Sequence, residues 1–113
     1  MTQEVSQPIF ELRQYDVFEG QLDRWVEWMD TVLIPFQRSV GMVVVGSWYS
    51  REKNQYIWIR RFESEEDRKR LYKAVYEHEF WLNEALPIVQ EMLSRDSGRT
   101  ITDMNASALS ILR

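Results

Sequence analysis

The side chain in this sequence best suited to acid–base or metal chemistry is its single histidine, His78. Histidine exchanges protons near neutral pH and is a common iron ligand. The spacing of Leu71, Val75 and Leu82 predicts a helix that holds His78 on its inward face. Two chemical roles follow, a base in a pocket or a proximal haem ligand. A partly buried histidine that hydrogen-bonds a carbonyl group is the more frequent arrangement at such a position.

Four aromatic residues form the second group of candidates, because they could line a cavity for a flat or apolar molecule. They are Tyr15, Trp48, Trp58 and Trp81. Ligand pockets are mostly apolar with a few polar groups, and the chain is rich in rings, with five Trp, five Tyr and five Phe. Packing in the core or between subunits is the more frequent use of such side chains. The sequence leaves both interpretations open.

Arg60 is the charged candidate for ligand binding. Arg60 and Arg61 are consecutive in a predicted strand, so their side chains lie on opposite faces and one of them points inward. A buried guanidinium group has to be paired. An inward arginine here either pairs with a carboxylate such as Glu11 or binds an anionic ligand, and pairing is the more frequent outcome.

Composition and motifs exclude several other kinds of site. The chain has no cysteine, and the acids beside His78 point in other directions on a helix, so no metal site is expected. Nucleophile triads and the phosphate and dinucleotide fingerprints are absent, so no cofactor is expected. A net charge of −4 argues against nucleic acid as a partner. Without a signal-peptide core or an apolar run of ~20 residues, we expect a cytoplasmic protein with no membrane span.

A hairpin organises the predicted fold. Residues 42–49 and 55–62 are rich in β-branched and aromatic side chains and predict two strands joined by the polar loop 50–54. Strict alternation would place Val44 and Trp48 on the same face of the first of these strands. Both strands are apolar on both faces, which indicates that something covers each face.

Two helical patterns flank the hairpin. Apolar residues recur at helical spacing over 21–40, with a kink or break expected just before Pro35. After the hairpin, Ser64 followed three residues later by Asp67 predicts the start of the second helix. Its apolar pattern is interrupted at Pro87 and then resumes, which predicts a kinked continuation or a second short helix.

The order of predicted elements is strand, helix, strand, strand, helix, strand, with the first strand at 9–18 and the last at 99–112. This is the ferredoxin-like α+β arrangement, an antiparallel four-stranded sheet with its helices on one face. One domain spans 9–113 after a flexible segment at 1–8. Because the open face of the sheet is apolar, we predict a homodimer in which two sheets pack face to face.

Four short motifs stand in a distinctive order and spacing. They are Glu11-Leu12-Arg13-Gln14-Tyr15 followed by Gly20, Gly46-Ser47-Trp48, the run from Trp58 to Ser64 with Glu66 and Arg68, and Glu79-Phe80-Trp81-Leu82 followed by Pro87. Together these motifs resemble the NIPSNAP family. The resemblance spans residues 10–93 and implies a dimeric α/β-barrel, the architecture of small cofactor-free monooxygenases, haem-degrading enzymes and some isomerases, without implying one reaction.

Three functional hypotheses follow. The first is a small apolar or aromatic molecule bound in a pocket between sheet and helices, as in a cofactor-independent oxygenase or isomerase. The second is a non-catalytic dimeric interaction module, which predicts no interior cavity of about 300 Å3 or more, the lower end for ligand sites. The third is haem binding or degradation, which needs room beside His78.

Overall fold

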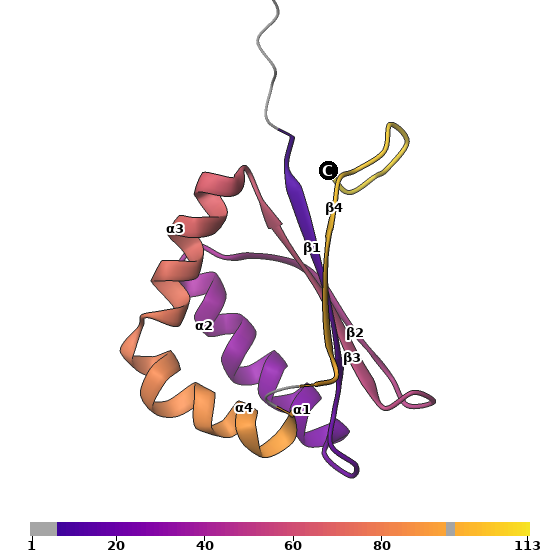
Figure 1. Ribbon diagram of the computed structural model, residues 1–113, viewed down its shortest axis with the longest axis vertical. Helices are drawn as coiled ribbons and strands as arrows, with labels where there is room; N and C mark the ends of the chain where they lie inside the picture. The colour runs from indigo at the N-terminus through magenta and orange to yellow at the C-terminus, as the bar shows by residue number, and fades with distance from the viewer. Residues whose placement is uncertain (1–6, 95–96) are drawn as a thin grey trace, which may run out of the picture.

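An antiparallel sheet of four strands forms one layer of the molecule, and all the labelled helices lie on one side of it (Figure 1). In this computed structural model, which describes residues 7–94 and 97–113, the spatial order is β2-β3-β1-β4. The predicted ferredoxin-like α+β fold is confirmed. Most of the segment 1–8, predicted to be flexible, lies outside the described residues. The strands are β1 (Ile9–Asp16), β2 (Val43–Ser50), β3 (Gln55–Phe62) and β4 (Arg99–Met104).

Each of the two helical segments, one before the hairpin and one after it, contains a π-helical turn next to a proline. Pro35 is the second residue of α2 and follows η1, while Pro87 is the second residue of α4 and follows η2. Proline has no N–H, and its ring clashes with the carbonyl one turn earlier, so an irregular turn accommodates it. The predicted break before Pro35 is therefore present as a π-helical turn. The helical elements are α1 (Leu22–Trp28), η1 (Met29–Leu33), α2 (Ile34–Ser39), α3 (Glu65–Tyr76), η2 (Trp81–Ala85) and α4 (Leu86–Met92).

The start of α3 is capped as predicted. The Ser64 hydroxyl oxygen accepts a hydrogen bond from the N–H of Asp67 at 3.1 Å, and the Asp67 carboxylate accepts one from the N–H of Glu63 at 3.0 Å. These reciprocal bonds satisfy donors that a helix leaves unpaired at its first turn. The helix ends at Tyr76, earlier than its apolar spacing predicts.

A β-bulge in β2 changes which side chains face the helices. The pairing of β2 with β3 shifts register between Val44 and Gly46, and one extra residue in a strand reverses the face of every later side chain. Val44 pairs with buried Arg60 and faces the helices, whereas Trp48 pairs with Ile57 and faces away. The prediction that Val44 and Trp48 share a face is therefore wrong.

The sheet face away from the helices carries an apolar surface, which we call the open face. Val43 and Trp48 on it are 46% and 50% exposed, while Leu12, Ile57 and Ile59 are half-buried. The core proper lies on the other side, between sheet and helices. Within the described residues, no helix is both long and apolar enough to cross a bilayer.

The last strand is shorter than predicted. β4 ends at Met104, so the predicted strand 99–112 is wrong beyond that residue. Asp103 and Asn105 are poor strand residues, and the segment 105–113 leaves the sheet to lie on the side away from the helices (Figure 1).

Candidate functional site

A cavity of about 150 Å3 lies between the sheet and the helices. Three of the predicted ligand-binding residues line it, namely Tyr15, Trp58 and Trp81. Both π-helical turns contribute to its wall, through Leu33 of η1 and Trp81 of η2, and such turns recur at functional sites. The other lining residues are Arg13, Trp25, Gln37, Tyr72, Tyr76, Val89, Leu93, Arg99 and Ile101.

The volume of this sheet–helix cavity limits what it could hold. At about 150 Å3 it is smaller than the ~300 Å3 at which drug-sized ligand sites begin. An apolar cavity of ~150 Å3 holds a single aromatic ring. Arg99 and Ile101, both exposed on the edge strand β4, mark its rim.

Arg60 is paired as predicted. Its Nη2 lies 2.7 Å from Oε1 of Glu11, and both residues are 0% exposed. Its Nη1 also donates to the side-chain oxygen of Gln37 at 3.1 Å and to the hydroxyl of Tyr76 at 2.9 Å. Arg60 itself is not part of the cavity wall, but Gln37 and Tyr76 are.

A second buried arginine, Arg13, lies in the cavity wall. Its Nη1 donates to Oε1 of Glu11 at 2.9 Å and to the hydroxyl of Tyr72 at 3.2 Å, and its Nε donates to the hydroxyl of Tyr15 at 2.6 Å. The sequence holds a signal for this position, because Glu11, Arg13 and Tyr15 alternate along β1 and share the face that packs on the helices.

The cluster around Glu11 keeps its groups in defined charge states. Burial raises the pKa of Glu11, but Arg60, the hydrogen bond from Tyr72 and Arg13 together bring that pKa below its ordinary value. Burial and the hydrogen bond to Glu11 raise the pKa of Tyr72 to about 12. At neutral pH the cluster therefore contains a carboxylate, two guanidinium groups and a neutral phenol.

Two tryptophan N–H groups in the cavity wall are buried without an acceptor. Neither Trp25 nor Trp58 donates its Nε1–H to any described residue, and each side chain is 1% exposed. Buried polar groups are nearly always hydrogen-bonded. The two rings also pack edge-on around Tyr15, with centroids 6.0 and 6.3 Å away.

The prediction that His78 faces inward is wrong. Because α3 ends at Tyr76, His78 falls between two helical segments and is exposed. Its Nδ1 accepts a hydrogen bond from the N–H of Phe80 at 3.0 Å, so the side chain caps the next helical turn instead of extending the apolar stripe. Its ring packs edge-on against Phe36. His78 is thus outside the cavity, and the room beside it is an open hollow flanked by Glu79 and Glu84.

Trp48 also lies outside the cavity, on the open face. The bulge in β2 turns it there, and its ring lies over Gly46, where an added Cβ would come within 2.4 Å of the indole. Local backbone features place Trp48 and His78 outside this cavity, whereas Tyr15, Trp58 and Trp81 lie in its wall, and ligand binding by these residues stays a prediction.

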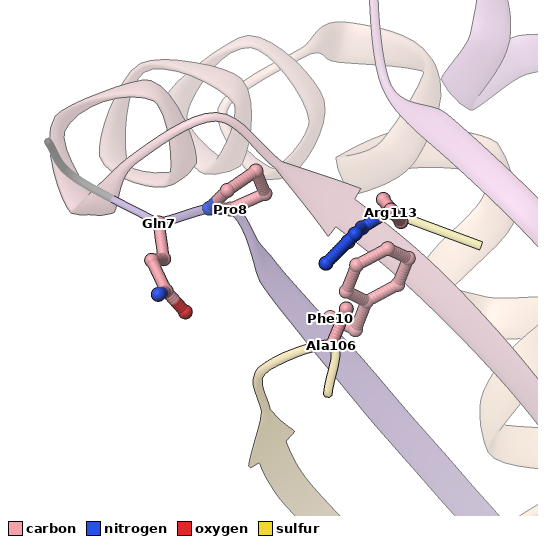
Figure 2. A pocket seen from close by; sticks show the side chains of 5 residues that line it. All are labelled: Gln7, Pro8, Phe10, Ala106 and Arg113. Atoms are coloured by element: carbon pink, nitrogen blue, oxygen red, sulfur yellow. The ribbon is translucent and has the colours of Figure 1, made fainter. Parts of the chain in front are cut away.

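Another hollow, of about 210 Å3, lies at the opposite side of the sheet, where the start of β1 meets the C-terminal segment. Figure 2 shows Phe10 with Ala106 and Arg113 around it. The carbonyl of Arg113 accepts a hydrogen bond from Nε of Arg61 at 2.7 Å. Phe10 is therefore buried although it lies on the open face. Among the described residues no group of three or more His, Asp or Glu side chains could hold a metal ion.

Several wall residues were not singled out by the sequence. Tyr72 and Tyr76 are four residues apart in α3 and so lie on one face of that helix, a spacing that the sequence does show. Trp25 lies three residues after Leu22 and four before Met29, so it belongs to the same buried stripe of the first helical segment. Arg99 lies in β4, and the pairing of β4 with β1, which brings Arg99 opposite Tyr15, cannot be read from the sequence.

Comparison with known proteins shows which family and which solved structures this chain is similar to. The sequence matches the NIPSNAP family over residues 10–108. A NIPSNAP family protein of unknown function from Agrobacterium tumefaciens has 21% identity and a TM-score of 0.83, with all of both chains covered. A second protein of the family from that organism has 17% identity and a TM-score of 0.83, covering 100% of this chain and 97% of that one. An uncharacterised NIPSNAP-like protein from Burkholderia xenovorans has 22% identity and a TM-score of 0.81, covering 92% and 89%. No curated protein matches the sequence significantly.

Proposed function

The chain belongs to the NIPSNAP family, and we propose that it binds a small apolar or aromatic molecule between sheet and helices. The relatives from Agrobacterium tumefaciens with 21% identity and from Burkholderia xenovorans are themselves of unknown function or uncharacterised. The proposal is therefore argued from the cavity. The observation that carries this proposal is a cavity of about 150 Å3 walled by aromatic residues, two of which have buried N–H groups with no acceptor among the described residues. An interior that served packing alone would fill this volume, because unfilled space costs stability.

The wall chemistry favours binding over turnover. Arg13 could stabilise negative charge on an oxygen atom, as a cofactor-independent oxygenase or isomerase requires. Proton transfer also needs a base within reach of the substrate. The described wall residues include no histidine and no carboxylate, and both oxygens of Glu11 are already bonded.

Native mass spectrometry of protein purified from its own host, followed by denaturation, tests the binding proposal. We expect a bound molecule of single-ring size, with loss of that molecule in the Trp81→Ala variant. Trp48→Ala is the matched control, because Trp48 is an aromatic residue outside the cavity. An empty wild-type protein, or equal loss of the molecule in both variants, would count against a site in this cavity.

We also propose that two copies of the chain pair through their open faces, as the family resemblance implies. Support comes from the apolar side chains there, of which Val43 and Trp48 are about half exposed. Contiguous apolar surface of this kind usually marks an interaction site. A second copy offers the same apolar surface, so a two-fold pairing would be self-complementary.

Sedimentation velocity at micromolar concentration tests the pairing. Trp48→Glu places a charge in the proposed interface and should shift the protein from dimer to monomer. Leu82→Glu is the control, because Leu82 is 51% exposed, close to the 50% of Trp48, but belongs to the helical layer. A wild-type monomer would refute the pairing, and so would a dimer that survives Trp48→Glu.

A non-catalytic dimeric interaction module is the second candidate function. The small volume of the cavity favours it, since about 150 Å3 agrees with its prediction of no cavity of 300 Å3 or more. The two candidates differ in one measurement: an interaction module purifies without a bound small molecule and binds none on titration.

A further inference from the structure

We infer that the cavity selects an anion of single-ring size, such as an aromatic carboxylate, and that Arg13 and the Trp58 N–H hold its oxygen atoms. This inference rests on the proposed function, because it names the class of molecule that the sheet–helix cavity would bind. It follows from the charge balance and the unused hydrogen-bond donors of the wall.

The buried cluster carries more positive than negative charge. Arg13 and Arg60 share a single carboxylate, Glu11, and neither is within ion-pair distance of any other described acid. Arg68 also approaches Glu11, at 3.5 Å, but it has its own partners in Glu65 and Asp103. A buried charge without a counter-ion is costly. An anionic ligand would complete the pairing of two arginines with two negative groups.

Arg13 has donors left over for such a ligand. Its Nε and Nη1 bond Tyr15, Glu11 and Tyr72, whereas Nη2 makes no hydrogen bond to a described residue. Each guanidinium group carries five N–H donors in a rigid fork. Since Arg13 is 9% exposed and lies in the cavity wall, a ligand in the cavity could accept from Nη2.

The two tryptophans add donors to the same wall. The Nε1–H groups of Trp58 and Trp25 lack acceptors among the described residues, and both rings line the cavity. Trp58 and Arg13 are direct cross-strand partners, so their side chains leave the sheet next to each other. No carboxylate of the described wall competes for these donors. A ligand with two acceptor oxygens at one end and a ring at the other matches this arrangement.

Isothermal titration calorimetry with three probes tests the inference. Benzoate has the ring and the charge, benzamide has the ring without the charge, and acetate has the charge without the ring. We expect benzoate to bind about tenfold or more tightly than either of the others, because charge-assisted bonds are roughly twice as strong as neutral ones. Arg13→Gln should remove the preference for benzoate over benzamide. Trp58→Phe should weaken the binding of benzoate, because it removes the indole N–H while keeping an aromatic ring in the cavity wall.

Arg51→Gln is the matched control, because Arg51 is an exposed arginine whose partner, Asp23, is exposed too. It should leave all three affinities unchanged. Equal binding of benzoate and benzamide would overturn the anion inference and leave the proposed function standing. Failure of every probe would also overturn it, and the proposed function would then survive only if native mass spectrometry finds another bound molecule. Thermal unfolding of Arg13→Gln confirms that the variant is folded, and Trp58→Phe gives an independent test if it is not.

Discussion

The substitution Glu11→Gln tests the charge balance of the buried cluster directly. Oε1 of Glu11 accepts hydrogen bonds from Arg13 and Arg60, Oε2 accepts one from Tyr72, and the side chain is 1% exposed. Glutamine keeps the shape but leaves two buried guanidinium groups without a carboxylate. Removing one partner of a buried ion pair costs about 3–5 kcal/mol. We therefore expect the free energy of unfolding to fall by about that amount.

Urea unfolding followed by tryptophan fluorescence measures this loss, as a lower midpoint at an unchanged denaturant slope. Glu91→Gln is the control, because Glu91 pairs with Arg24 at the surface, where the two side chains are 57% and 52% exposed. Such surface pairs contribute less than about 1 kcal/mol. If Glu11→Gln lowers the free energy of unfolding no more than Glu91→Gln does, the stability of the cluster does not depend on the charge of Glu11.

The stability of the wild type and that of the Glu11→Gln variant should also depend differently on pH. The pKa of Glu11 is below its ordinary value of 4.5 in the folded protein, since Arg60, Tyr72 and Arg13 outweigh the effect of burial. A carboxyl group of this kind stabilises the fold fully above its unfolded pKa, and the contribution is lost as pH falls through the folded pKa. The advantage of the wild type over Glu11→Gln should therefore shrink below about pH 4.5. A constant difference down to about pH 2 would refute the assignment.

Further substitutions test other parts of the structure. Val89→Leu adds a methylene group that extends into the cavity, so the free energy of unfolding should stay the same or rise by up to about 0.8 kcal/mol. Val75→Leu adds the same group to filled core and should lower the free energy of unfolding by about 1–3 kcal/mol. Both changes are measured from the midpoints of urea unfolding. Ser64→Ala removes the cap of α3 and should cost about 1 kcal/mol in the same assay. Gly46→Ala forces Trp48 off the sheet, because the new Cβ would lie 2.4 Å from its ring. It should weaken the proposed dimer, measured by sedimentation velocity, without unfolding the protein.

The sequence was sufficient for features that depend on local chemistry. The β-branched and aromatic residues of β3, the Ser64 cap and the interruptions beside the prolines are each decided by a few neighbouring residues, and each lies where the patterns predict it. The pairing of Arg60 with Glu11 followed from a general rule, that a buried charge needs a partner. From these elements the order of strands and helices, and hence the fold, was predictable.

The sequence was insufficient where one residue changes the register. A single bulge moves Trp48 from the helix side to the open face. The end of α3 at Tyr76 moves His78 out of the interior, although its spacing fits the apolar stripe. The sequence does not reveal Arg13 as a wall residue, because its neighbours in the wall, Trp58 and Ile101, come from other strands and meet it only through the register of the sheet. Spacing along one element cannot supply such cross-strand information.

The composition of the cluster argues that the cavity has a use beyond packing. Replacing buried ion pairs by apolar residues of similar volume is often neutral or stabilising, so stability alone does not require two arginines and a carboxylate beside a ring-lined space. All three guanidinium nitrogens of Arg60 are hydrogen-bonded, to Glu11, Gln37 and Tyr76, and with Glu11 it would already form a balanced pair. Arg13 adds a second positive charge; of these two arginines it is the one that lies in the wall, and its Nη2 makes no hydrogen bond to a described residue. The excess charge is therefore placed where a ligand could neutralise it.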